Sequence, residues 1–296
     1  MNYKELQVWQ PQVMARFERV LQENKLGHAY LFSGHFASFD MALFLSQAQF
    51  CTESSNHLPC GNCRNCRLIA NEEFTDVTVV RPQGNVIRTE TIRELVKHFT
   101  QSGFESTKQI FIVCDADKMH PNAANSLLKV IEEPQIDVTI FLLTNHEEAM
   151  LPTIKSRTQI VSFPKNRAVL TEYLEKEGVL KSQARILAEL VASQDEALQL
   201  IKNKAFQELM VVIPRFVKAL LEMPNQAYLM VSQLINLTSD KEEQERLLEL
   251  LTLTLAEHRM DSLAQSYLAG LIEVRSMWKS NVSLQNALEY MILKKE

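Results

Sequence analysis

The sequence is poor in glycine. Seven glycines occur in 296 residues, and Gly270 is the only one beyond Gly178. Because glycine destabilises helices, a C-terminal half that nearly lacks it, and is rich in Leu, Met, Gln and Glu, is predicted to be helical. Pro214 and Pro224 are expected to divide those helices, since proline interrupts helical hydrogen bonding.

Long hydrophobic runs and an excess of positive charge are also absent. The longest apolar runs, such as Ile110–Cys114 and Ile140–Leu143, are far below the ~18 residues that a membrane helix needs. No basic segment followed by an apolar one begins at Met1, so we expect no signal peptide and a cytoplasmic protein without a membrane partner. The formal net charge of −5, without an aromatic–basic cluster, argues against nonspecific nucleic-acid binding.

Hydrophobic periodicity divides the chain into three predicted domains. Helical spacing over residues 5–25, with Pro11 near its start, predicts one helix. The part up to residue 164 alternates further helices with short apolar runs typical of buried parallel strands: His28–Phe32, Asp76–Val80, Gln109–Cys114, Asp137–Thr144 and Thr158–Phe163. We therefore expect an α/β domain over residues 1–164, a small helical domain over 165–205 and a helical domain over 206–296.

A cysteine cluster interrupts the α/β domain at residues 51–66. The ligand candidates Cys51, Cys60, Cys63 and Cys66 have the spacing C-x8-C-x2-C-x2-C. Four closely spaced thiolates suit tetrahedral Zn²⁺ in a closed, structural site, and this interpretation is favoured over disulfides or unrelated thiols in a reducing compartment. With only Arg64 and Arg67 nearby, the module is predicted to staple a loop rather than to contact nucleic acid.

A segment with the strand–loop–helix order of a phosphate-binding loop follows residue 28. Such a loop requires G-x-x-x-x-G-K-[ST], and counting from Gly34 places Phe39, Asp40 and Met41 where Gly, Lys and Ser or Thr belong. Asp40 would repel phosphate, and Met41 cannot ligate Mg²⁺. The sequence therefore predicts a degenerate loop that binds no ATP.

Four stretches together resemble the bacterial clamp-loader subunits of DNA polymerase III. They are the run from His28 to Gly34, the four-cysteine insertion, Asn125–Pro134, and Thr153–Arg157. The resemblance implies an AAA+-type domain with a zinc insertion, a helical lid and a helical collar. It also implies partners: motor (gamma/tau) and delta subunits in a ring that places a sliding clamp on primed DNA.

The resemblance assigns roles to single residues. Alignment on residues 125–129 places Cys114 at the metal-binding aspartate of the second acidic motif and Asp115 at its catalytic glutamate, whereas a one-residue shift exchanges the missing acid. Asp195 falls where motor subunits carry a second-sensor arginine. Ser156 and Arg157 retain the start of the Ser-Arg-Cys motif, which implies that Arg157 acts as an arginine finger on a neighbouring subunit's ATP.

These features predict a non-hydrolysing stator subunit. The chain would belong to a DNA-directed DNA polymerase holoenzyme and would have no catalytic activity in isolation. Two alternatives stay open at this stage. One is an active AAA+ ATPase of the gamma/tau kind with an unorthodox loop, and the other is a zinc-dependent nucleic-acid-binding protein.

Overall fold

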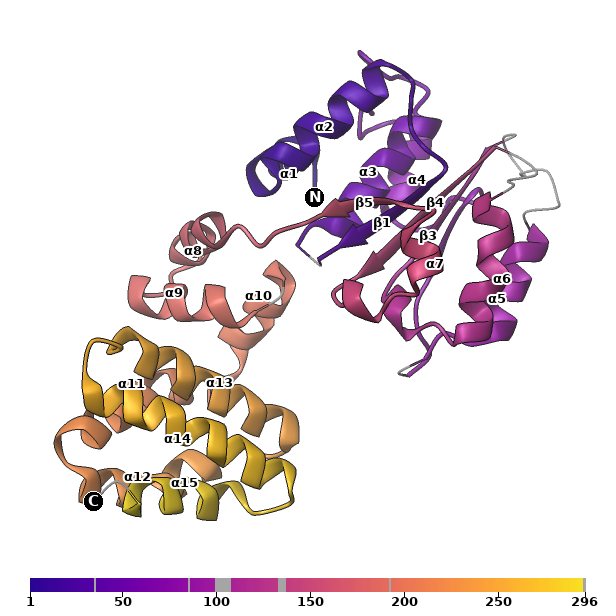
Figure 1. Ribbon diagram of the computed structural model, residues 1–296. Coiled ribbons are helices and arrows are strands. Elements are labelled where there is room, and N and C mark those ends of the chain that lie inside the picture. Colours follow the sequence, from indigo (N-terminus) through magenta and orange to yellow (C-terminus); the bar gives the residue numbers. More distant parts are fainter. Residues whose placement is uncertain (35, 85, 99–107, 133–136, 192, 295–296) are drawn as a thin grey trace. The chain divides into compact units, whose positions relative to one another are not determined.

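The structure is a computed structural model that describes residues 1–34, 36–84, 86–98, 108–132, 137–191 and 193–294. It divides into two compact units, Met1–Asn166 and Arg167–Glu296, which are described separately below (Figure 1). The three-domain division with boundaries at residues 164 and 205 stays a prediction.

The first unit is built on a parallel five-stranded sheet with the strand order β2-β3-β4-β1-β5. Its strands are β1 Ala29–Ser33, β2 Val77–Val80, β3 Lys108–Val113, β4 Asp137–Thr144 and β5 Gln159–Ser162. Each lies within one residue of a predicted strand at both ends, because continuous apolar runs mark strands that are buried on both faces. The predicted α/β class with a parallel sheet is confirmed.

The helices of this unit connect and flank the strands. They are α1 Tyr3–Trp9, α2 Pro11–Gln22, α3 Ser38–Phe50, α4 Arg64–Ala70, α5 Thr89–His98, α6 Pro121–Glu132 and α7 Pro152–Lys155, with short 3-10 turns η1 Ala116–Lys118 and η2 Glu147–Ala149. The single helix predicted over residues 5–25 is wrong, because the backbone at Gln10 leaves the helical region and Pro11 starts a second helix. Proline favours that first helical position.

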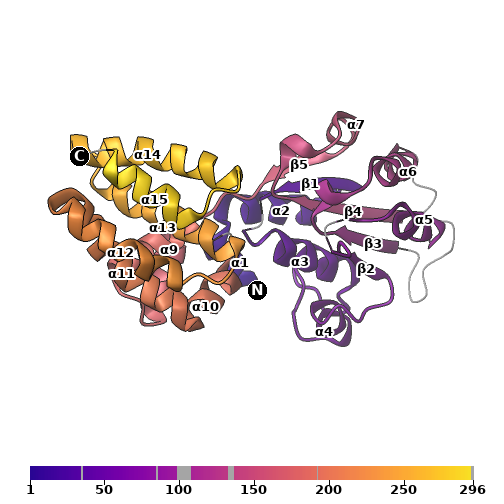
Figure 2. The ribbon, with the colours of Figure 1, turned by 90° about the horizontal axis from the view of Figure 1, so that it is seen from below.

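Helices cover both faces of the sheet (Figures 1 and 2). On one face, Tyr30 and Phe32 of β1 meet Phe17 of α2, with ring centres 5.5 and 5.8 Å apart. On the opposite face, Leu31 belongs to a core with Ile92 of α5 and residues of α6 and α7. The alternation along β1 therefore anchors both helical layers to one strand.

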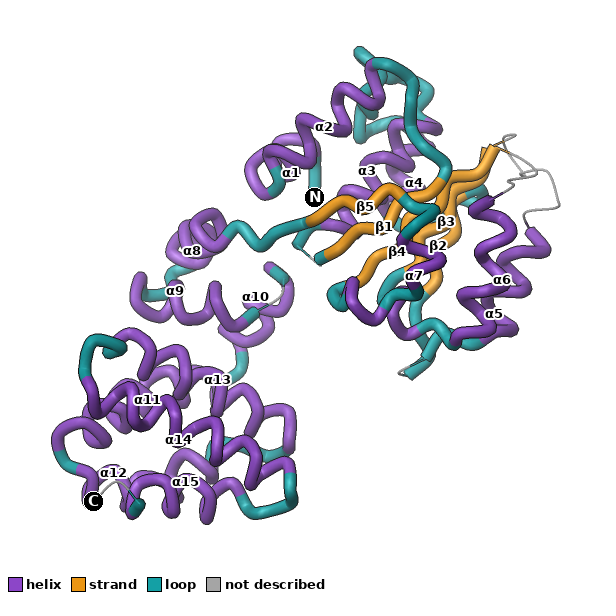
Figure 3. The backbone as a smooth tube through the Cα atoms, viewed as in Figure 1, coloured by secondary structure: helices purple, strands orange, loops and turns teal. Residues whose placement is uncertain are grey.

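The second unit consists of helices joined by short loops, as Figure 3 shows. They are α8 Arg167–Lys176, α9 Lys181–Leu190, α10 Gln194–Lys202, α11 Lys204–Glu222, α12 Pro224–Asn236, α13 Lys241–Glu257, α14 Ser262–Lys279 and α15 Leu284–Leu293. Pro224 begins α12 as a helix boundary, but Pro214 lies inside α11, so the expectation that it divides the helices is wrong. The buried side chains of Ile213, Phe216 and Val217 hold that helix against its neighbours despite the lost hydrogen bond.

None of the helices in the described part of the chain is both long enough and apolar enough to cross a bilayer.

Candidate functional site

The carboxyl ends of β1 and β4 lie side by side at the centre of the sheet. Open α/β sheets bind ligands beyond such strand ends, where the connections diverge to opposite faces. The loop that follows β1 occupies this place. Its first residue, Gly34, donates its backbone N–H to the carbonyl of Thr144 at 2.8 Å. The loop after β1 thus lies at the edge of the sheet where open α/β folds bind ligands, and its interpretation as a degenerate phosphate-binding loop stays a prediction.

Gly34 is required here by close packing. Its φ of +110° disfavours any side chain, and a Cβ would lie 2.4 Å from the carbonyl oxygen of Phe163, just after β5. Phe163 in turn donates its backbone N–H to the carbonyl of Ser33 at 2.7 Å. The glycine therefore lets β5 and the loop after β1 approach each other, a role independent of phosphate.

The interior of the loop is filled by protein side chains. Phe36 is 3% exposed and packs on Trp9 with ring centres 5.0 Å apart. The buried Gln10 amide donates from Nε2 to the carbonyls of Phe36 and Pro164, each at 2.8 Å. Residues at the α1–α2 junction thus pack against the loop. The contacts of Gln10, Trp9 and Phe36 at this loop are not predictable from the sequence. The only signal there is a polar glutamine directly before Pro11.

At the three positions where the motif residues are missing, the side chains of Phe39, Asp40 and Met41 each make contacts within the protein. Met41 is fully buried in the core. Asp40 forms an ion pair with the amino group of Met1. The guanidinium of Arg81 lies over the ring of Phe39. No cationic side chain stands at the position that would meet phosphate, because that position is the acidic Asp40.

The two aspartates beyond β3 are each paired with a nearby donor, Asp115 with Lys118 and Asp117 with Thr144. Burial raises the pKa of the Cys114 thiol to about 11, so it is not a thiolate near neutral pH. Asp115 has a left-handed backbone with φ 49° and an ion pair to Lys118 at 3.3 Å. Asp117 accepts a 2.6 Å hydrogen bond from the Thr144 hydroxyl. Asp195 lies in α10 of the second unit.

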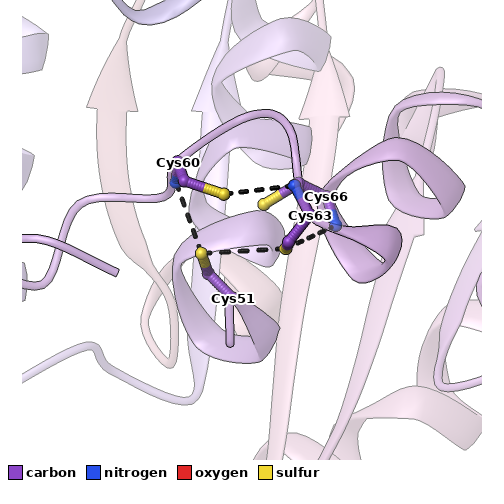
Figure 4. Close-up of side chains that lie close together, drawn as sticks. All are labelled: Cys51, Cys60, Cys63 and Cys66. Atoms are coloured by element: carbon purple, nitrogen blue, oxygen red, sulfur yellow. Dashed lines mark hydrogen bonds between the residues drawn. The ribbon is translucent and has the colours of Figure 1, made fainter. Parts of the chain in front are cut away.

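The four cysteines converge from the end of α3, the loop that follows it and the first turn of α4 (Figure 4). Cys51 follows α3, and Cys63 caps α4. All four Sγ atoms, those of Cys51, Cys60, Cys63 and Cys66, lie within 4.8 Å of one another. The sulfurs of Cys51 and Cys63 are 3.9 Å apart, close to the separation of about 3.8 Å that follows from tetrahedral Zn–S bonds of about 2.3 Å.

Backbone N–H groups donate to three of the four sulfurs. Cys60 donates to the Cys51 sulfur at 3.3 Å, and Cys63 donates to the Cys60 sulfur at 3.2 Å. Burial raises the pKa of the Cys51 and Cys66 thiols. At Cys63 burial also raises the pKa, but backbone and side-chain hydrogen bonds from Cys66 and Thr52 outweigh it and lower the pKa to about 6. Four sulfur donors with this spacing and geometry fit a tetrahedral metal ion and leave no position for substrate.

Arg157 follows α7 and is 39% exposed at its side chain. Its Nε pairs with Glu132 at the end of α6. Its Nη1 donates to the carbonyl of Thr153 at 3.1 Å and to the hydroxyl of Ser156 at 3.0 Å. The structure therefore brings the Ser156 hydroxyl against the Arg157 guanidinium, and the role that the resemblance implies for the two residues stays a prediction. At the position of the family's cysteine, Thr158 donates its hydroxyl to the Ile154 carbonyl at 3.0 Å.

Comparison with known proteins follows this geometry. Residues 9–167 match the family model described as "DNA polymerase III, delta subunit". The DNA polymerase III subunit delta' of Bacillus subtilis is 30% identical over 322 aligned positions, which cover 99% of this chain and 98% of the relative. The gamma/tau subunit of Mycobacterium bovis is 32% identical over 188 positions, or 60% of this chain and 32% of the relative.

A solved structure shares the architecture. The DNA polymerase III gamma subunit-related protein of Thermotoga maritima superposes with a TM-score of 0.52 at 18% identity, covering 95% of this chain and 97% of that one. At that identity the likeness shows the fold alone. Together with the parallel sheet and the four neighbouring cysteines, it confirms the predicted AAA+-type fold.

Proposed function

This chain belongs to the family of DNA polymerase III delta' subunits, and we propose that it is the non-hydrolysing stator of a clamp loader. In this role it binds no ATP itself. It presents Arg157 to the ATP of a neighbouring gamma/tau-like motor subunit. The ring would also contain a delta subunit and would place a sliding clamp on primed DNA.

The filled loop after β1 is the observation that carries the stator role. A phosphate-binding loop must offer backbone N–H groups and a lysine to the phosphates. Here Phe36 is buried under Trp9, and Gln10 is bonded to the loop carbonyl. Asp40 adds a negative charge at the lysine position. A nucleotide would have to displace a packed aromatic side chain and also meet an anion, so catalysis in cis is not expected.

Arg157 supports action in trans. It is partly exposed after the short helix α7, and two protein oxygens hold its Nη1. A guanidinium can donate to a γ-phosphate and stabilise the charge that develops in phosphoryl transfer. Such a finger contributes about 10³- to 10⁵-fold in rate in other nucleotide hydrolases.

Exposed apolar side chains of the second unit support its proposed role as a collar. Leu229 of α12, Ile272 of α14 and Leu293 of α15 are 76%, 72% and 56% exposed. Contiguous exposed apolar patches are typical of surfaces that associate with other chains, and we propose that these side chains contribute to one. We propose that residues 206–296 bind the neighbouring subunits and that residues 165–205 form the lid.

The cysteine cluster is proposed to hold a structural Zn²⁺. Cys51, Cys60, Cys63 and Cys66 would supply all four ligands and fix the loop between α3 and α4. A closed sulfur shell offers no open coordination position, so the ion would stabilise the fold and take no part in chemistry. The proposal places the chain in the cytoplasm with the replicating DNA.

Two measurements test this function. Equilibrium titration with a fluorescent ATP analogue should detect no binding to the isolated chain. In an assembly whose other ATP sites are silenced by substitution of the motor subunits' phosphate-loop lysine, Arg157→Ala should slow hydrolysis at the remaining interface by at least about 100-fold. Arg93→Ala, at an exposed arginine of α5, is the matched control. Full ATPase activity in the Arg157→Ala assembly would overturn the proposal.

A further inference from the structure

We propose that Glu132 is a positioning residue for Arg157: it holds the guanidinium by Nε so that Nη2 faces outward to the neighbouring subunit's phosphate. This inference rests on the proposed function of Arg157. It adds a second residue, 25 positions earlier in the chain, to the machinery of that interface.

The hydrogen bonds of Arg157 divide its guanidinium into a held part and an available part. Nε pairs with the Glu132 carboxylate, and Nη1 donates both to the Thr153 carbonyl and to the Ser156 hydroxyl. Nη2 makes no hydrogen bond to any residue within the described ranges. Because the guanidinium is planar, fixing Nε and Nη1 also fixes the direction in which Nη2 donates.

Glu132 and Arg157 both lie next to backbone that is held by buried side chains. Ile131, the residue before Glu132, is 1% exposed, and Ile154 in α7 is fully buried. These two isoleucines belong to the same core. The separation between the ends of α6 and α7 is therefore set by packing, and the carboxylate meets Arg157 without ordering a loop. A positioning group on rigid elements holds its partner more accurately than one on a free segment.

The Ser156 hydroxyl completes the support. It accepts from Nη1 of Arg157 and donates to the Thr153 carbonyl at 3.1 Å. Ser156 and Thr153 alone engage one nitrogen, about which the guanidinium could still swing. The contact from Glu132 to a second nitrogen removes that freedom, which lowers the entropy to be lost when the guanidinium meets the transferring phosphoryl group in the transition state.

The ion pair is better suited to orientation than to stability. The Arg157 and Glu132 side chains are 39% and 45% exposed. Ion pairs with this exposure are screened by solvent and contribute little to folding. Substitution of Glu132 should therefore leave the fold intact while it changes the orientation of Arg157, so an effect on hydrolysis can be separated from an effect on folding.

The experiment measures ATP hydrolysis in the assembly with the other sites silenced. Glu132→Gln and Glu132→Ala should lower kcat about 3- to 10-fold with an unchanged KM for ATP, since the contact acts on transition-state geometry. Glu132→Asp should restore part of the rate. Glu94→Gln, at an exposed glutamate of α5, is the control, and thermal unfolding of every variant should match that of the parent chain.

A double variant separates the two proposals. In the Arg157→Ala background, Glu132→Gln should have no further effect, because a positioning residue acts only through the group that it positions. If Arg157→Ala lowers the rate and Glu132→Gln does not, the positioning role is overturned and the finger stands. If Arg157→Ala has no effect, both are overturned. A rate that rises in Glu132→Gln would identify Glu132 as a restraint and would also overturn the positioning role.

Discussion

The guanidinium of Arg81 lies 5.1 Å from the centre of the Phe39 ring. Arg81 directly follows β2, and Glu72 holds it through two hydrogen bonds of 2.6 and 2.7 Å. Phe39 stands where a phosphate-binding loop has its second glycine. A partly exposed cation over an aromatic face stabilises by about 0.5–1 kcal/mol. Arg81, Trp9 and Gln10 therefore pack against this segment from positions far apart in the sequence.

Restoring the motif should therefore not restore nucleotide binding. The triple variant Phe39→Gly, Asp40→Lys, Met41→Thr recreates the loop's residue types but leaves Phe36 and its partners in place. We expect no ATP binding by calorimetry at protein concentrations of about 100 μM. The variant should also be less stable by about 2 kcal/mol or more, since Met41 is fully buried. Micromolar binding would show that the motif residues alone decide the loop's chemistry.

Removal of the metal tests the cysteine site. The purified chain should contain one equivalent of zinc, measured by mass spectrometry of the metal, and Cys60→Ser should lose it together with several degrees of melting temperature. Cys114→Ser is the matched control, because Cys114 lies outside the cluster and should leave the zinc content unchanged. Retention of a full equivalent in Cys60→Ser would contradict the four-ligand site.

A half-buried carboxylate of the second unit, that of Glu249, predicts a pH-dependent stability. Burial raises the pKa of Glu249, Arg275 partly offsets this, and Glu245 and Glu196 raise the pKa further. The folded state then binds the proton more tightly than the unfolded chain, so ionisation at neutral pH costs stability. Glu249→Gln should raise the free energy of unfolding at pH 7.

That gain should shrink as the pH falls through the raised pKa of Glu249 and vanish below its ordinary value of 4.5, where the carboxyl is neutral in both states. Urea unfolding at a series of pH values measures it. Glu257→Gln, at an exposed glutamate of the same helix, is the control. An equal gain at all pH values would assign the effect to something other than ionisation.

Two glycines with positive φ separate backbone strain from crowding. Gly34→Ala combines φ +110° with a Cβ 2.4 Å from the Phe163 carbonyl, whereas Gly84→Ala has φ +66° and no atom within 4 Å. We expect about 1–2 kcal/mol of destabilisation at Gly84 from strain alone, and a clearly larger loss at Gly34, measured by chemical unfolding. Equal losses would mean that Phe163 moves away without cost.

Local sequence patterns predict the secondary-structure elements better than they predict the tertiary contacts between those elements. The strands follow from apolar runs, and the cysteine site follows from its spacing, because both are written in neighbouring residues. The break at Gln10 was missed, since helical periodicity continues across it while the glutamine side chain serves carbonyls at Phe36 and Pro164. Pro214 was misjudged for a similar reason: burial of the α11 face outweighs a local helix breaker.

The candidate site shows the same division. Ser156 and Arg157 were recognisable as a short motif. Nothing in the neighbouring sequence marks Arg157 as the partner of Glu132, because their contact depends on how α6 and α7 pack in three dimensions. The contact between Arg81 and Phe39 is likewise not predictable from the sequence, because nothing near Arg81 marks it as the neighbour of a residue 42 positions earlier.

The strand order has a consequence for synthesis of the chain. β1 pairs with β4 and β5, and its first partner residue, Ile140, emerges from the ribosome more than a hundred residues after Ala29. During that interval the apolar residues of β1 have no strand to pair with. The four cysteines are complete by Cys66, so the metal module can fold early. The metal module would then hold α3 and α4 together until synthesis of β4 and β5 completes the sheet.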